Sequence, residues 1–401
     1  MANEKSRSLY DRASNVIPWG TQTNAKRPIE SCLPEMPLYI ERAKGCRMWD
    51  VDGNEYIDYR GALGPIILGY ADDDVDRAVK AQLDQGILFS MAAPQEIELA
   101  EAVCQFVPGA EMVRFLKTGG DACSAAVRLA RAVTGREEIV SIGYHGWHDW
   151  TVAGWAGRDL GVPRSTAGLV HRVDYGNASQ VSQRFEQSGG DIACIMVTPY
   201  DWESEPEASY LQHLRQLSDD HGTLLIFDEV LTGFRLAMGG SQEYFKIDAD
   251  LAVFGKALAN GYPLSALTGK REIMREMEKI FVTSTHAGEL ASIAAALATL
   301  EKLDRCNVVK DIEEKGDLLM EGICSIFKEL DIPGKVVGLP AGFNVSVGDA
   351  DSTGLEAAFV KRLFANGLFW DYRVSLCYSH SRSDIDETLL RIKTAAREAR
   401  G

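Results

Sequence analysis

Four short stretches hold residues suited to catalysis or ligand binding, and each directly follows an apolar run. A glycine pair with an aspartate stands at 118–121, an aromatic and histidine-rich stretch at 143–148, two carboxylates at 228–229, and a lysine at position 256. Ligands in open α/β sheets bind beyond the carboxyl ends of the strands. If the apolar runs are strands of one sheet, we expect these stretches to converge on one ligand-binding crevice.

Asp228 and Lys256 are the charged residues with the clearest chemical roles. A carboxylate at the end of an apolar strand needs a partner, and a protonated ring nitrogen would supply one. A helix cap or an internal salt bridge is the alternative explanation for Asp228. A lysine at the end of an apolar strand can act as an amine nucleophile. Taken alone, Lys256 would more often be an exposed loop lysine.

The glycine pair and the aromatic stretch are weaker signals. Gly119 and Gly120 would present backbone N–H groups at a helix N-terminus, where the dipole favours an anion such as phosphate. Tyr144 offers a flat face for stacking, although a single aromatic residue more often packs in a core. His145 and His148 have an H-x-x-H spacing, but no third ligand stands at a recognisable distance in sequence, so we predict no metal site.

Strand and helix patterns alternate through the middle of the chain. Such alternation predicts an α/β fold with a mostly parallel sheet covered by helices on both faces. The expected strands are 112–116, 139–142, 192–197, 223–227, 251–254 and 264–268, and the expected helices are about 122–133, 210–221, 289–303 and 309–329.

The two ends of the chain have a different pattern. The tail has short strand-like pieces around helices at about 355–366 and 382–399, which predicts a smaller α+β domain. Near the start, residues 47–58 have the pattern of a hairpin with Asp52-Gly53 in its turn. We therefore expect three parts, namely an N-terminal segment (1–60) that packs with the small domain, a large cofactor-binding domain (61–300) and a small C-terminal domain (301–401).

Composition narrows the class of protein. The chain has 401 residues, with 58 acidic and 42 basic side chains and a formal net charge of −16. Such a surface repels phosphate backbones and anionic lipid, so we expect neither nucleic acid nor a membrane as partner. No apolar run approaches the roughly 18 residues that span a bilayer. Eight scattered cysteines in an acidic chain without an apparent export signal indicate a cytoplasmic protein.

Two stretches resemble a known family signature. LLIFDEVLTGFR at 224–235 and DLAVFGKALANG at 250–261 are similar to class III (subgroup II) pyridoxal-phosphate-dependent aminotransferases, especially proteins of the glutamate-1-semialdehyde 2,1-aminomutase type. Further similarity, including GPIILG at 64–69 and YHG at 144–146, extends from about residue 6 to about residue 395. The resemblance implies fold type I of the pyridoxal-phosphate-dependent transferases, with a seven-stranded, mostly parallel sheet in the large domain and a smaller α+β domain.

The resemblance also implies catalytic roles. Lys256 would form a Schiff base with pyridoxal 5'-phosphate and later move the substrate proton. Asp228 would pair with the pyridine nitrogen, which keeps the ring an electron sink. Tyr144 would stack on that ring.

Further cofactor contacts follow from the same resemblance. Gly119, Gly120 and Asp121 would lie in the phosphate cup, although family members more often carry threonine and glutamate at the last two positions. Thr285 matches a threonine that reaches the phosphate from the neighbouring subunit. That role requires a homodimer with shared active sites.

The chain departs from the aminomutase type where substrate is held. The stretches 22–27 and 370–373 both differ from the family pattern, while the cofactor residues are kept. Similar chemistry on a different substrate is the natural interpretation. Lys26, Arg27 and Arg373 are candidate binders of a substrate carboxylate or other anion, with ordinary surface or interface charge as the alternative.

These observations favour an aminotransferase that moves an amino group between an amino acid or modified amino compound and a carbonyl substrate. An intramolecular aminomutase and a pyridoxal-phosphate amino-acid epimerase or racemase are the enzymatic alternatives. A non-catalytic cofactor-binding protein is disfavoured, because it would not need both Lys256 and Asp228.

Overall fold

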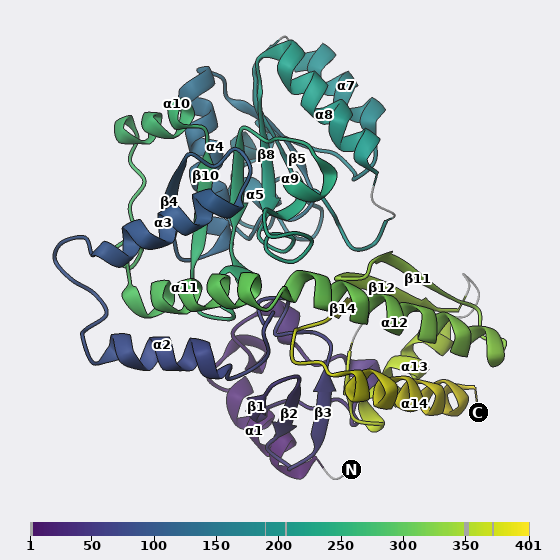
Figure 1. Cartoon of the computed structure of the whole chain (residues 1–401). Coiled ribbons are helices and arrows are strands. Elements are labelled where there is room, and N and C mark those ends of the chain that lie inside the picture. Colours follow the sequence, from purple (N-terminus) through teal and green to yellow (C-terminus); the bar gives the residue numbers. More distant parts are fainter. Residues whose placement is uncertain (1–2, 189, 205–206, 349–352, 371–372, 401) are drawn as a thin grey trace. The chain divides into compact units, whose positions relative to one another are not determined.

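The structure, a computed structural model, describes residues 3–188, 190–204, 207–348, 353–370 and 373–400 (Figure 1). Contacts divide the chain into two compact units. The first comprises Met1–Asp72, Trp202–Glu205 and Lys310–Gly401, and the second comprises Asp73–Asp201 and Pro206–Val309. The three-part domain division expected from the sequence stays a prediction.

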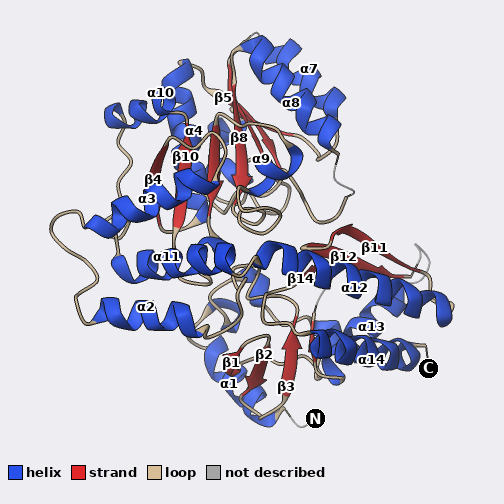
Figure 2. Cartoon of the chain, in the orientation of Figure 1, coloured by secondary structure: helices blue, strands red, loops and turns tan. Residues whose placement is uncertain are grey.

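A seven-stranded sheet forms the centre of the second unit (Figure 2). Neighbouring strands from β9 through β8, β7 and β5 to β6 run parallel, whereas β10 runs antiparallel to both β4 and β9. The mostly parallel sheet predicted from the sequence is therefore confirmed. In sheet order its strands are β4 (Met112–Leu116), β10 (Ser265–Gly269), β9 (Leu251–Phe254), β8 (Leu224–Glu229), β7 (Ile192–Val197), β5 (Glu138–Ile142) and β6 (Val170–Arg172).

Strand β8 extends further than the sequence pattern indicated. Asp228 and Glu229 were expected to follow the strand, but they pair with Val253 and Phe254 of β9 and so belong to it. The apolar run ends before the backbone pairing does, because a paired backbone does not require an apolar side chain. The short edge strand β6 had no apolar run long enough to predict it.

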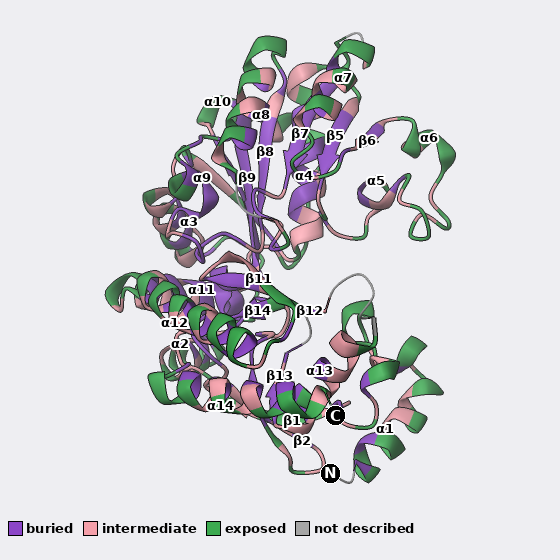
Figure 3. Ribbon diagram, turned by 90° about the vertical axis from the view of Figure 1, so that its right-hand side faces the viewer, coloured by how far each residue is buried: buried purple, intermediate pink, exposed green. Residues whose placement is uncertain are grey.

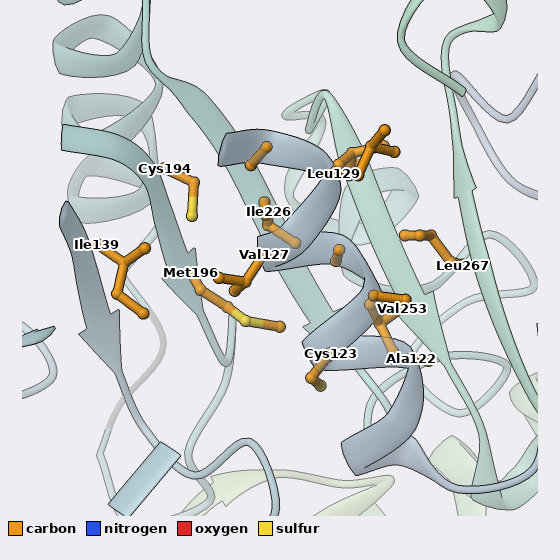
Figure 4. Close-up of a cluster of buried hydrophobic side chains, with 14 of the residues drawn as sticks. Ala122, Cys123, Val127, Leu129, Ile139, Cys194, Met196, Ile226, Val253 and Leu267 are labelled. Atoms are coloured by element: carbon orange, nitrogen blue, oxygen red, sulfur yellow. The ribbon is translucent and has the colours of Figure 1, made fainter. Parts of the chain in front are cut away.

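Helix α4 (Gly119–Thr134) packs its apolar side on this sheet. Figure 4 shows Ala122 and Val127 of α4 beside Met196 of β7 and Val253 of β9, all of them buried. The strands of the sheet are buried along most of their length, while the outer sides of the helices are exposed (Figure 3). Among the described residues of this second unit, the other helices of eight or more residues are α2 (Asp73–Leu83), α3 (Pro94–Phe106), α7 (Ala178–Ser188), α8 (Ala208–His221) and α11 (Leu290–Arg305).

The first unit combines segments from both ends of the chain. Its two sheets have the orders β1-β2-β3-β13 and β11-β12-β14, and the predicted hairpin is present as the antiparallel pair β2 and β3. Strand β13 pairs in parallel with β3, which joins the two chain ends directly.

The elements of this unit agree with the short strands and helices expected near the C-terminus. They are α1 (Glu4–Ser14), β1 (Ile40–Lys44), β2 (Arg47–Asp50), β3 (Glu55–Asp58), α12 (Val308–Glu329), β11 (Gly334–Leu339), β12 (Gly342–Val347), α13 (Thr353–Ala365), β13 (Leu368–Phe369), β14 (Arg373–Ser375) and α14 (Arg382–Ala399). No described helix in either unit is both long enough and apolar enough to cross a bilayer.

Gly143 directs the chain from β5 into the stretch with Tyr144 and His145, and we predict that it tolerates no side chain. Its φ is +102°, and an added Cβ would lie 2.6 Å from Oγ1 of Thr198. Strain and overlap together predict that Gly143→Ala lowers the free energy of unfolding by about 3 kcal/mol. Denaturant unfolding followed by circular dichroism would measure this loss.

Gly135 provides the matched control, because it ends α4 at φ +70° with nothing within 4 Å of an added Cβ. Gly135→Ala should lower the free energy of unfolding by only about 1 kcal/mol, because it introduces the strain of a left-handed backbone without steric overlap. Equal losses in the two variants would contradict the steric explanation.

Candidate active site

The four polar stretches lie at the same edge of the sheet. Asp228 stands at the carboxyl end of β8, and Lys256 follows the carboxyl end of the neighbouring parallel strand β9. Tyr144 and His145 follow β5, which runs in the same direction through β7. Thr118 follows β4, which has the same direction as β9 because both oppose β10. The predicted convergence at the carboxyl ends therefore agrees with the sheet topology.

Asp228 holds a buried carboxylate with hydrogen-bond donors on both oxygens. Only 4% of the residue is exposed. Oδ2 accepts from Nδ1 of His145 at 2.7 Å and from Sγ of Cys123 at 3.6 Å, and Oδ1 accepts from the backbone N–H of Val230 at 3.1 Å. His145 must donate, because an ionised carboxylate can only accept. These contacts offset the cost of burial and fix the orientation of the group.

His145 and Cys123 are site residues that the sequence analysis did not assign to this role. His145 had been considered only as a metal ligand, and Cys123 had not been singled out. His145 does follow Tyr144 in a stretch already marked for chemistry, which is the one signal that pointed to it. Cys123 offered none, because a cysteine among apolar helix positions looks like any other small core residue.

The Cys123, His145 and Asp228 side chains place three potential metal-ligand atoms within 4.8 Å of one another. Two ligand atoms on a tetrahedral zinc lie about 3.3 Å apart, given metal–ligand distances of about 2.0 Å. The 2.7 Å separation between Nδ1 and Oδ2 is instead that of a direct hydrogen bond. The histidine next in the motif is engaged elsewhere, since Nδ1 of His148 lies 2.6 Å from Oγ of Ser124. The geometry is that of a hydrogen-bonded cluster.

Glu229, the residue after Asp228, secures the end of β8. Its carboxylate is fully buried and accepts from Oγ1 of Thr232 at 2.5 Å and from the backbone N–H groups of Ser241 at 2.7 Å and Gln242 at 3.2 Å. Burial raises the pKa of Glu229 to about 7. Its bonds to the start of α9 (Gly240–Phe245) tie the loop after Asp228 to the core.

Lys256 stands in a strained backbone position beside the Asp228 cluster. Its φ is +44°, in the left-handed region that non-glycine residues seldom adopt. The residue is half-buried at the start of a short 3-10 helix, Lys256–Ala259. Burial raises the pKa of the Cys123 thiol, the Asp228 carboxylate raises it further, and the Lys256 ammonium lowers it. Both charges therefore act on the same thiol.

The N-terminus of α4 lies against the loop that carries His145. Thr118 caps the helix, with its Oγ1 accepting from the N–H of Asp121 at 3.1 Å and its own N–H donating to the Asp121 carboxylate at 3.0 Å. A Cβ on Gly146 would lie 2.9 Å from Cα of Gly120, and a Cβ on Gly119 would lie 2.9 Å from a methyl group of Val230. Only glycine allows this close approach.

The remaining predicted contacts have exposed side chains. Tyr144 is 57% exposed, and Thr285 is exposed in a turn before α11. Ring stacking by Tyr144 and the phosphate contact of Thr285 therefore stay predictions.

The candidate substrate residues belong to the first unit. Lys26 is exposed, and the guanidinium of Arg27 lies 4.5 Å from the ring centroid of Trp19. Arg373 forms an ion pair with Glu203 at 2.5 Å, so its charge already has a partner. Residues 371–372 of the divergent stretch lie outside the described residues. Substrate binding by these cations stays a prediction.

Comparison with known proteins decides the family. The profile of the family described as aminotransferase class-III matches residues 31–372. The chain belongs to the class-III aminotransferases. A glutamate-1-semialdehyde 2,1-aminomutase of Methanothermobacter thermautotrophicus is 39% identical over 355 residues, covering 85% of this chain and 83% of that protein. A 3-aminobutyryl-CoA aminotransferase of Cloacimonas acidaminovorans is 33% identical, covering 99% of this chain and 97% of that protein.

Solved structures agree with this family and its cofactor. The FumI protein of Sphingopyxis sp. MTA144, determined as a PLP internal aldimine form, superposes with a TM-score of 0.92 at 30% identity, covering 98% of this chain and 96% of that one. Class-III aminotransferases use pyridoxal phosphate, so the chain is a pyridoxal-phosphate-dependent enzyme, as predicted. The expected fold class is confirmed as well.

The residues at the strand ends fit this cofactor. A carboxylate has about four lone-pair positions, and the three donors to Asp228 leave one for the N–H of a pyridinium ring. Nε2 of His145 is buried and has no hydrogen-bond partner among the described residues. At the start of α4, Gly119 has no space for a Cβ, which would lie 2.9 Å from a methyl group of Val230.

We predict that His145 supports cofactor binding through Asp228. Hydrogen bonds to charged groups contribute about 1.5–3 kcal/mol, so His145→Ala should weaken pyridoxal phosphate binding by about 10- to 100-fold. His145→Asn keeps a donor near the Nδ1 position and should bind within a few-fold of the unmodified protein. Absorbance titration of the cofactor-free protein would measure the dissociation constants.

His171→Ala is the matched control, because its imidazole, on the edge strand β6, pairs with Glu138 of β5 at 2.7 Å. It should leave cofactor affinity unchanged. Unaltered affinity in His145→Ala, with circular dichroism showing an intact fold, would refute the role of His145.

Proposed function

We propose that Lys256 and Asp228 carry the chemistry of an aminotransferase that acts on an amino acid or modified amino compound and a carbonyl acceptor. The supporting observation is the buried, triply hydrogen-bonded carboxylate of Asp228 on β8, with Lys256 directly after the neighbouring parallel strand β9. Each residue then has one task, since Asp228 holds the ring nitrogen protonated and Lys256 supplies the reactive amine.

Bound pyridoxal phosphate supplies an aldehyde that takes up amino groups and a ring that delocalises the electron pair left when a substrate carbon loses its proton. Nζ of Lys256 would hold that aldehyde in the absence of substrate and would become a free amine once the amine of a substrate takes its place. The released Nζ would then accept the proton from the substrate carbon as a general base and deliver it to another carbon as a general acid. The strained backbone of Lys256 fixes the origin of this side chain.

The start of α4 is the proposed phosphate end of the site. The N–H groups of Gly119 and Gly120 and the positive end of the helix dipole favour an anion there. Asp121 contributes through the capping box, which holds these N–H groups in place. Tyr144 provides the stacking face for the ring, next in sequence to the histidine that binds Asp228.

An intramolecular aminomutase is the second candidate. The relative from Methanothermobacter thermautotrophicus, a glutamate-1-semialdehyde 2,1-aminomutase at 39% identity, favours it. The altered stretches at 22–27 and 370–373 argue against the same substrate. The 3-aminobutyryl-CoA aminotransferase relative supports transfer between two molecules.

We further propose a cytoplasmic homodimer in which Thr285 reaches the partner's cofactor. Several large apolar side chains of the second unit are exposed, including Met91 at 82%, Phe281 at 81% and Ile97 at 62%. Phe281 lies in the same segment as Thr285. A second copy of the chain would cover such apolar surface. None of the eight cysteines forms a disulfide, which supports a reducing compartment.

The decisive experiment follows the absorbance of the bound cofactor with a panel of amino donors. We expect one donor alone to bleach the cofactor band and a keto acid to restore it. Borohydride should trap the cofactor on the peptide that contains Lys256, whereas Lys256→Ala should lose turnover by several orders of magnitude. Turnover of a single substrate without a second one would indicate a mutase, and exchange of the substrate proton without amino transfer would indicate an epimerase.

The proposed homodimer predicts the mass of the protein in solution. Sedimentation velocity should give twice the 44.0 kDa mass of the chain. Thr285→Ala should keep that mass and weaken cofactor binding by roughly 3- to 10-fold, because one neutral hydrogen bond contributes about 1 kcal/mol. A 44.0 kDa species that retains full activity would disprove the shared site.

A further inference from the structure

The segment between β5 and β6 carries an unusual stack of one tryptophan and two arginines. The guanidinium carbons of Arg158 and Arg172 each lie 4.0 Å from the ring centroid of Trp155. Trp155 in turn meets the ring of Tyr144 edge-on, with 6.4 Å between the centroids. The stack therefore begins at the residue that we place against the cofactor ring.

The two arginines differ in how their charges are used. Arg172 donates from Nη1 to the carbonyl of Thr151 at 2.8 Å and from Nη2 to the carbonyl of Gly143 at 3.2 Å, so it holds the segment to the core. Arg158 is exposed, and its guanidinium forms no hydrogen bond or ion pair with any of the described residues. Arg158 is thus a cation held in place by a ring but not neutralised.

The charge of Arg158 also acts on Tyr144, the residue that we place against the cofactor ring. Burial raises the pKa of the Tyr144 hydroxyl, while the Arg158 guanidinium lowers it and the Asp228 carboxylate raises it. The phenol of Tyr144 therefore feels both charges. Burial and the charge of Arg158 also lower the pKa of Arg172, so the two guanidiniums repel each other. A bound anion would relieve that repulsion.

We propose that Arg158, held on the face of Trp155, binds the carboxylate of the amino donor. This assignment rests on the proposed function and narrows its substrate class to amino acids with a free carboxylate. It adds a candidate to the carboxylate binders expected from the sequence, of which Arg373 is already paired with Glu203.

A carboxylate fits this position better than a larger anion. The planar guanidinium fork can donate two parallel hydrogen bonds to a carboxylate, and stacking on Trp155 leaves its edge open. A coenzyme A thioester carries several phosphate charges, which a chain of net charge −16 repels and one guanidinium does not balance.

The test uses a matched pair of amino donors, 3-aminobutyrate and 3-aminobutanamide, which differ in the charge of one end. Stopped-flow bleaching of the holoenzyme gives an apparent dissociation constant and a rate constant for each. We expect Arg158→Ala to lower the preference for the carboxylate over the carboxamide by about 10- to 100-fold, mainly through the dissociation constant of 3-aminobutyrate. Arg158→Lys should recover part of the preference.

Arg164→Ala is the control, because Arg164 is an exposed arginine of the same segment, whereas the described cations over the Trp155 ring are Arg158 and Arg172. It should leave the preference unchanged. Butyrate, which lacks the amine, should inhibit bleaching of the unmodified enzyme competitively and inhibit Arg158→Ala at least 10-fold more weakly, which gives a binding readout independent of turnover.

The outcomes separate this inference from the proposed function. If no donor in the wider panel bleaches the cofactor, the proposed function fails. If donors bleach it but Arg158→Ala and Arg164→Ala show the same preference, or if only donors without a carboxylate react, the assignment of Arg158 is overturned and the aminotransferase stands.

Discussion

The candidate active site depends on keeping one carboxylate buried in a defined orientation. Asp228 lies inside the protein, where an unpaired charge is costly. The hydrogen-bond donors that offset this cost come from three different places, namely His145 after β5, Cys123 on α4 and the backbone of Val230 after β8. The sheet, the helix and the loop must all be in position before the carboxylate is tolerated. Folding and preparation of the cofactor site are therefore coupled.

The residues around Asp228 also depend on close packing to keep their positions. Lys256 adopts a left-handed backbone conformation, which persists only where neighbouring structure enforces it. Gly119, Gly120 and Gly146 allow the His145 loop and the end of β8 to approach the start of α4. Glu229 ties the following loop to α9. The well-packed core of α4 and the sheet thus keeps Lys256 in its strained backbone conformation.

Much of this arrangement could be predicted from sequence because it is encoded locally. Strands β7 and β9 match their expected limits, since an uninterrupted apolar run marks a strand buried on both faces. The end of β8 was missed, because its last two residues are charged although they still pair with β9.

The contacts of Asp228 were harder to foresee. His145 and Cys123 are far from it in sequence, and only the parallel order of the strands brings them together. Residue types alone do not show which of several histidines or cysteines will meet a given carboxylate. The stack of Arg158 on Trp155 is similar, since neither residue follows a strand directly.

The parallel pairing of β3 with β13 has a consequence for biosynthesis. Ile57 and Leu368 are register partners, with the N–H of Ile57 donating to the carbonyl of Gly367 at 3.0 Å, although most of the chain is translated between these two strands. The ribosome releases β3 long before β13 is made, so the edge of β3 stays unpaired during that time. The second unit is encoded between the two strands and can already collapse. This topology therefore leaves the edge of β3 without its neighbour until β13 has been translated.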